Sequence, residues 1–90
     1  MHYAASKGAV TAMSHGLGLE VAREGIRVNC VHPGIIETEL NPPERVAKIA
    51  PTIPIGRSGK VDEVASVVLF LLSSAASYVL GADLRISGGR

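Results

Sequence analysis

The first quarter of the chain carries apolar side chains at the spacing of an amphipathic helix. They recur every three or four residues, at Val10, Met13, Leu17 and Val21. The surrounding stretch is rich in alanine and leucine and contains no proline, so the pattern predicts one long helix over residues 1–24. Gly25 stands where a left-handed glycine commonly ends a helix, and Arg23 precedes it, facing the negative end of the helix dipole.

Two further segments follow with different patterns. Residues 26–32 mix β-branched with short polar side chains and stop at Pro33 and Gly34, which predicts a strand that ends in a turn. Four of the five prolines fall within residues 35–54. We therefore expect an irregular excursion there, around one short helix at residues 44–50, of the kind that often covers a site.

The last third of the chain predicts a helix and a second strand. Asp62 and Glu63 place negative charge at the start of a helix over residues 61–72 that is apolar on nearly every side. A turn at residues 78–81, in which we expect Tyr78 to pack, leads to a short strand at residues 82–87. Strand, helix and strand in this order indicate a parallel βαβ unit with a right-handed crossover.

Composition suggests that this unit is part of something larger. Hydrophobic residues make up 47% of the 90 residues and charged residues only 19%, with a mean hydropathy of +0.29. Two parallel strands do not form a stable sheet by themselves, so we expect partner strands outside these residues. The net charge of +1, the lack of a basic run and the 3% of aromatic residues argue against nucleic-acid binding.

The single cysteine and the three histidines argue against a disulfide framework and a metal site. Cys30 cannot form an internal disulfide or a multi-cysteine zinc site, and we expect it to be a buried thiol in a reducing compartment. His2, His15 and His32 lack the spacing of metal ligands, so no metal is expected. The longest apolar stretch, residues 64–72, is too short to cross a bilayer, and no secretory signal is visible, which favours a cytoplasmic location without a membrane anchor.

Two residues near the start of the first helix suggest acid–base chemistry. Tyr3 and Lys7 are four residues apart, so their side chains share one helix face. An ammonium within a few ångströms lowers the pKa of a tyrosine from its ordinary value of about 10, which makes the hydroxyl usable as a general acid or base. Taken alone, a tyrosine and a lysine at this spacing more often face solvent than take part in catalysis.

The turn after the first strand offers a place for a ligand. In open parallel sheets, ligands bind beyond the carboxyl ends of the strands, where Pro33 and Gly34 are expected. Gly34 has no side chain to keep a ligand away, and the Thr38 hydroxyl can hydrogen-bond an amide or a phosphate. An ordinary turn with an exposed threonine remains the alternative.

Seven short motifs lie in order along the chain, at residues 3–7, 25–29, 33–38, 54–57, 62–65, 77–81 and 87–89. Together they make the chain resemble the C-terminal part of the short-chain dehydrogenase/reductase family. Within the family, the motifs are most similar to those of glucose/ribitol dehydrogenase-like and oxoacyl-carrier-protein reductase-like members. The resemblance implies an α/β fold, with residues 1–90 forming the C-terminal portion of a single doubly wound, Rossmann-like domain.

The resemblance also implies a site and a reaction. Tyr3 would be the catalytic acid/base, and Lys7 would lower its pKa and hold the nicotinamide ribose. Pro33, Gly34 and the main chain of Ile36 would line the nicotinamide, and Thr38 would contact its carboxamide or a phosphate. The reaction would be reversible hydride transfer between NAD or NADP and a small carbonyl or alcohol substrate, in an enzyme that commonly forms homo-oligomers.

The chain lacks several features of the family pattern. It contains no glycine-rich Gly-x-x-x-Gly-x-Gly turn for the pyrophosphate, no asparagine motif and no catalytic serine ahead of Tyr3. We therefore expect the 90 residues alone to be inactive. The alternative is a non-catalytic module derived from such an enzyme, which keeps an oligomerisation or interaction surface.

Overall fold

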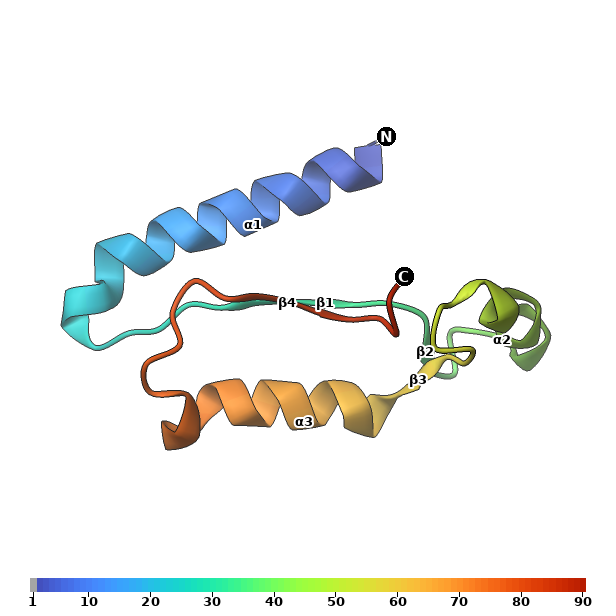
Figure 1. Ribbon diagram of the computed structural model, residues 1–90. Helices are drawn as coiled ribbons and strands as arrows, with labels where there is room; N and C mark the ends of the chain where they lie inside the picture. Colours follow the sequence, from blue (N-terminus) through green and yellow to red (C-terminus); the bar gives the residue numbers. More distant parts are fainter. Residues whose placement is uncertain (1) are drawn as a thin grey trace.

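The computed structural model describes the backbone of residues 2–90 and the side chains of residues 5–90. Figure 1 shows a central pair of strands with one helix on each side of it. Over these described residues, the α-helices are α1 (His2–Val21), α2 (Pro43–Ile49) and α3 (Val61–Leu72). The strands in the same range are β1 (Cys30–Pro33), β2 (Ile36–Glu37), β3 (Gly59–Lys60) and β4 (Asp83–Ile86).

Strands β1 and β4 pair in parallel, which confirms the predicted βαβ unit. Their register places Cys30 opposite Asp83 and His32 opposite Arg85. Side chains alternate across a strand, so these four residues share one face of the pair. Helix α3 returns the chain between the two strands on the side opposite α1 (Figure 1).

Strand β1 is shorter than the sequence predicted, because it begins at Cys30 rather than at Ile26. An amide side chain takes over the pairing just upstream of the ladder. Asn29 Nδ2 donates to the Val79 carbonyl at 3.2 Å, and Asn29 Oδ1 accepts from the Ala82 amide at 2.9 Å. The polar residue in the predicted strand therefore joins the two chain segments through its side chain instead of its backbone.

The long N-terminal helix is confirmed over the described residues. Its last three residues tighten into a 3₁₀ turn, Ala22–Glu24, before the predicted glycine stop. Gly25 has a φ of 79° and its amide donates to the Ala22 carbonyl at 3.2 Å. This left-handed conformation carries little penalty only for glycine.

The proline-rich excursion contains more order than its pattern indicates. Helix α2 lies within one residue of the predicted short helix. However, β2 pairs in parallel with β3, a ladder of two residues that the sequence analysis did not predict. A Cβ on Gly59 would lie 3.0 Å from Ile36 Cδ1, so the glycine permits this close pairing.

The buried core is small, as the expected need for partner strands implies. Its apolar members are Cys30, Ile53, Leu71 and Ala76. Cys30 is thus a buried thiol, as predicted.

The prediction that Tyr78 packs at its turn is wrong, because its side chain is fully exposed there. Within residues 2–90, no helix is long and apolar enough to cross a membrane.

An ion pair fixes the start of α3 and gives a pH prediction. Arg57 contacts both carboxylate oxygens of Glu63, at 2.8 and 3.0 Å, and the Lys60 amide donates to Glu63 at 2.9 Å. The hydrogen bonds from Arg57 and from the Lys60 backbone lower the pKa of Glu63 to about 2. The pair's contribution to stability is therefore complete above the ordinary pKa of 4.5 and is lost as the pH falls toward 2.

We expect an NMR titration of the Glu63 carboxyl to show this low pKa, and Arg57→Gln to raise it toward 4.5. Both side chains are about half exposed, so the effect on folding is expected to be small. An unchanged Glu63 pKa in Arg57→Gln would contradict the assignment of the shift to Arg57.

Candidate functional site

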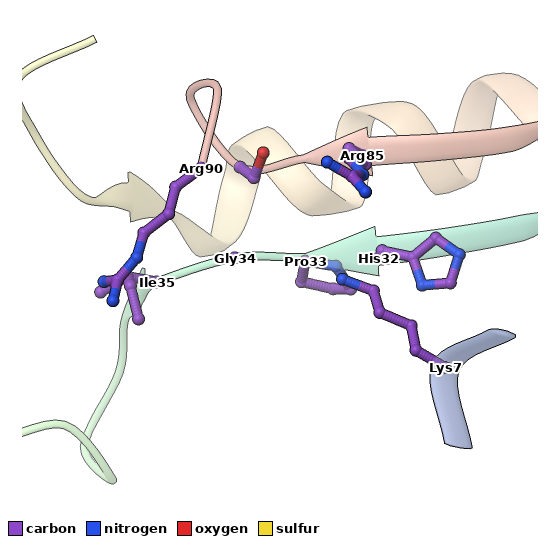
Figure 2. A pocket seen from close by; sticks show the side chains of 8 residues that line it. Lys7, His32, Pro33, Gly34, Ile35, Arg85 and Arg90 are labelled. Carbon is purple, nitrogen blue, oxygen red and sulfur yellow. The ribbon is translucent and has the colours of Figure 1, made fainter. Parts of the chain in front are cut away.

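A cavity lies where β1 and β4 end. It has a volume of about 290 Å³ and is lined by three groups of residues: Lys7 from α1, residues 32–35 from the end of β1, and Arg85, Ser87 and Arg90 from β4 and the turn after it. Figure 2 shows the Lys7 side chain reaching from α1 toward Pro33. The cavity thus occupies the carboxyl ends of the parallel strands, where α/β sheets bind ligands.

Helix α1 sets the position of Lys7. The Thr11 hydroxyl donates to the Lys7 carbonyl at 3.1 Å and lies 3.3 Å from His32 Nε2, so this part of the helix is tied to β1. Tyr3 lies one turn before Lys7 in the same helix, but its side chain is outside the described residues. The structure therefore places one member of the predicted Tyr3–Lys7 pair at the cavity.

Pro33 and Gly34 line the cavity, yet the reason for the glycine differs from the one expected. A Cβ on Gly34 would lie 2.8 Å from Ser87 Cβ and 2.9 Å from Ser87 Cα. The space in front of Gly34 is therefore filled by the chain's own turn after β4. Gly34 is required for the close approach of the two strand ends, and its backbone remains at the cavity edge.

Ile36 and Thr38 lie on the segment that leaves the cavity. Ile36 is half-buried in β2, and its carbonyl accepts a hydrogen bond from Asn41 Nδ2 at 2.8 Å. Thr38 is exposed, and its carbonyl accepts from the Asn41 amide at 3.1 Å. Neither is among the described residues that line the cavity. A ligand that touched both would have to extend from the cavity along β2.

The cavity is electropositive, which the sequence analysis missed. Arg85 and Arg90 join Lys7 in its lining. Three cationic side chains around one cavity favour an anionic ligand such as a phosphate ester. The alternation of residues along β4 could have placed Arg85 on this face, but only once the pairing of β4 with β1 was known.

Among the side chains of residues 5–90, the buried polar one is that of His32, with 9% of its surface exposed. Its Nε2 contacts Asp83 Oδ1 and lies 3.3 Å from the Thr11 hydroxyl. Local sequence spacing could not have found this group, because Asp83 comes 51 residues after His32. His32 borders both the cavity at the strand ends and a second one beneath α1.

Comparison with known proteins gives a consistent set of similarities. The family model described as Enoyl-(Acyl carrier protein) reductase matches residues 1–90. The chain is 49% identical over 92 residues to an uncharacterized oxidoreductase, YgfF, of Escherichia coli. It is 44% identical over 93 residues to a glucose and ribitol dehydrogenase homolog of Oryza sativa, and 47% identical over 91 residues to a 3-oxoacyl-[acyl-carrier-protein] reductase of Thermotoga maritima.

These matches cover 98 to 99% of this chain but only 31 to 37% of the relatives, so the chain spans about a third of their length. Solved structures give the same proportion. A short-chain type dehydrogenase/reductase from Mycobacterium marinum superposes with a TM-score of 0.85 at 43% identity, over 98% of this chain and 35% of its own. A blue fluorescent protein from a metagenomic library, solved in complex with NADPH, gives 0.86 at 39% identity, over 97% and 36%.

Proposed function

Because the chain belongs to the short-chain dehydrogenase/reductase family, as its motifs predicted, we propose that it supplies the tyrosine and lysine of an NAD(P)-dependent oxidoreductase. In this proposal, residues 1–90 are the C-terminal part of a single Rossmann-like domain. The observation that carries it is the position of Lys7, which lines the cavity at the ends of β1 and β4, one helical turn after Tyr3. The substrate would be a small carbonyl compound or alcohol.

The described residues fit one end of a nicotinamide dinucleotide. The cavity volume of about 290 Å³ lies at the low end of ligand pockets, so it has room for part of such a molecule. Its cationic lining suits the negative charge of the cofactor. Lys7, Pro33 and Gly34 would hold the nicotinamide and its ribose, and a cofactor extending along β2 would reach the Ile36 main chain and Thr38.

The bound cofactor would supply or accept the hydride, and the chain's own groups would move the proton. The Tyr3 hydroxyl would give its proton to the carbonyl oxygen during reduction and take the alcohol proton during oxidation. The Lys7 ammonium would favour the tyrosinate by its positive charge. The NADPH in one structural neighbour supports a nicotinamide cofactor and leaves NAD and NADP as alternatives.

A homo-oligomer is part of the proposal. Helix α1 exposes Val10, Met13 and Leu17, each with half or more of its surface accessible, and burial of such a face on association is favourable. The same exposed face would serve the alternative, a non-catalytic interaction module. The matches to oxidoreductases over nearly the whole chain favour the enzyme.

A chimera tests the proposed function. In it, residues 1–90 replace the matching segment of the Thermotoga maritima relative, which then supplies the rest of its own chain. We expect the chimera to oxidise NADH or NADPH with a carbonyl substrate, measured by loss of the reduced nicotinamide absorbance. We expect the 90-residue chain alone to show no turnover with the same cofactors.

The parent reductase and circular dichroism of the chimera are the controls. A folded chimera without turnover on any substrate of the parent would count against the proposal. Turnover by the 90-residue chain alone, lost in Tyr3→Phe, would show that the expectation of inactivity is wrong while supporting the assigned chemistry.

A further inference from the structure

Three side chains with different donor atoms meet on the face of the strand pair that is turned toward α1. Cys30 and His32 alternate along β1, and Asp83 stands opposite Cys30 on β4. One ligand atom of each, a sulfur, an imidazole nitrogen and a carboxylate oxygen, lies within 4.8 Å of the other two. We refer to these three residues as the Cys–His–Asp cluster.

We propose that the Cys–His–Asp cluster binds a divalent transition metal ion of the zinc type. Thiolate, imidazole and carboxylate are all common ligands of Zn²⁺. Bonds of 2.0–2.3 Å in a tetrahedral site separate neighbouring ligand atoms by about 3.4 to 3.8 Å, so small side-chain movements would adapt the cluster. The metal would lie between His32 Nε2 and Asp83 and replace their direct contact.

The surroundings of the cluster supply what a metal site needs besides its ligands. Thr11 Oγ1 lies 3.3 Å from His32 Nε2, so it neighbours the place that the metal would take. A cavity of about 570 Å³ under α1 is lined by His32 and Asp83. The Asp83 side chain is 44% exposed, so an ion can reach the cluster from solvent and keep a water as its fourth ligand.

The donor atoms of the cluster set the class of ion. One thiolate and one carboxylate neutralise a divalent cation, and they offset the opposing positive charge of Lys7 and Arg85, which line the same cavity. Hard cations such as Ca²⁺ or Mg²⁺, which require six or more oxygen ligands or water, are poorly matched by a thiolate and an imidazole. A borderline ion that accepts sulfur and nitrogen is favoured.

Cobalt titration of the reduced, folded chimera tests this proposal, with the parent reductase titrated alongside it as the blank. Co²⁺ reports tetrahedral coordination by intense visible bands and thiolate ligation by a charge-transfer band in the near ultraviolet. We expect both bands to saturate at one ion per chain and to disappear when Zn²⁺ is added. Cys30→Ser is expected to remove the charge-transfer band.

Asp83→Asn is the decisive variant, because only the fold brings residue 83 to Cys30 and His32. We expect it to raise the dissociation constant by roughly tenfold or more, and Asp83→Glu to recover part of the affinity. His15→Gln is the matched control, since this imidazole lines the same cavity but is not in the cluster. We expect it to change the dissociation constant by less than about threefold.

Three results would overturn the proposal. The first is the absence of the cobalt bands. The second is an Asp83→Asn chain that keeps the original affinity, and the third is the same affinity in urea. The last two would place binding on the local Cys30 and His32 pair, without the fold. None of these measurements depends on hydride transfer, so they are independent of the proposed oxidoreductase function.

Discussion

Replacing Tyr3 by phenylalanine in the chimera is expected to lower kcat by about 10²- to 10⁴-fold, the range that a positioned general acid or base contributes. The substitution removes one hydroxyl group and keeps the ring, so the helix should be unchanged. KM is expected to change little, because the hydroxyl acts mainly in the transition state. Steady-state kinetics at saturating cofactor measure this effect.

Lys7 gives a second readout of the same chemistry. Lys7→Met removes the positive charge that favours the tyrosinate, so the pKa of Tyr3 should rise. The alkaline limb of the pH–rate profile should therefore move to higher pH. Lys7→Arg keeps a charge and should restore part of kcat. Lys60→Met removes an exposed lysine at the start of α3 that does not line the cavity, and it should leave the rate within about twofold.

Either of two results would remove Tyr3 and Lys7 from the chemistry. One is a Tyr3→Phe chimera with the kcat of the unsubstituted chimera. The other is a Lys7→Met chimera with lower kcat but an unmoved pH profile, which would make Lys7 a structural residue only.

Local patterns were enough to predict the helices and the parallel pair. Helix α1 follows from its apolar spacing and ends near Gly25, and α3 follows from a continuous apolar run after Asp62 and Glu63. The pairing of β2 with β3 was missed because a ladder of two residues has no periodicity. Tyr78 was misplaced because its exposure depends on which elements face the turn, which local spacing does not contain.

The residues of the candidate site also divide into those that local spacing predicted and those that it did not. Tyr3 and Lys7 share a helix face by spacing alone, and the position of Pro33 and Gly34 follows from the end of a strand. The contact of His32 with Asp83 joins residues 51 positions apart. The close approach of Gly34 to Ser87 likewise joins the end of β1 to the end of β4. Such contacts require the register of β1 against β4, which the sequence alone did not specify.

Gly34→Ala is expected to lower the free energy of unfolding by about 1–3 kcal/mol, the usual cost of overfilling a packed contact. The added Cβ would lie 2.8 Å from Ser87 Cβ and 2.9 Å from Ser87 Cα. Gly34 does not have a positive φ, so the cost is steric and not conformational. Urea unfolding of the chimera, followed by circular dichroism, measures the change.

Two further variants distinguish a steric conflict with Ser87 from the effect that replacing any glycine by alanine would have on stability. Gly16 lies in α1 with nothing within 4 Å of an added Cβ, so Gly16→Ala should raise stability by about 0.5–1 kcal/mol. Ser87→Gly in the Gly34→Ala background removes the nearest atom but leaves Ser87 Cα at 2.9 Å, so it should recover only part of the loss.

The same steric conflict should reach the proposed cofactor cavity. The Gly34 amide donates to the Ile86 carbonyl at 3.0 Å, so a Cβ that pushes Ser87 away strains the last rung between β1 and β4. Both strand ends line the cavity, and Gly34→Ala in the chimera should therefore raise KM for the cofactor as well. A Gly34→Ala chain as stable as the original would show that the turn after β4 moves freely and does not shape the site.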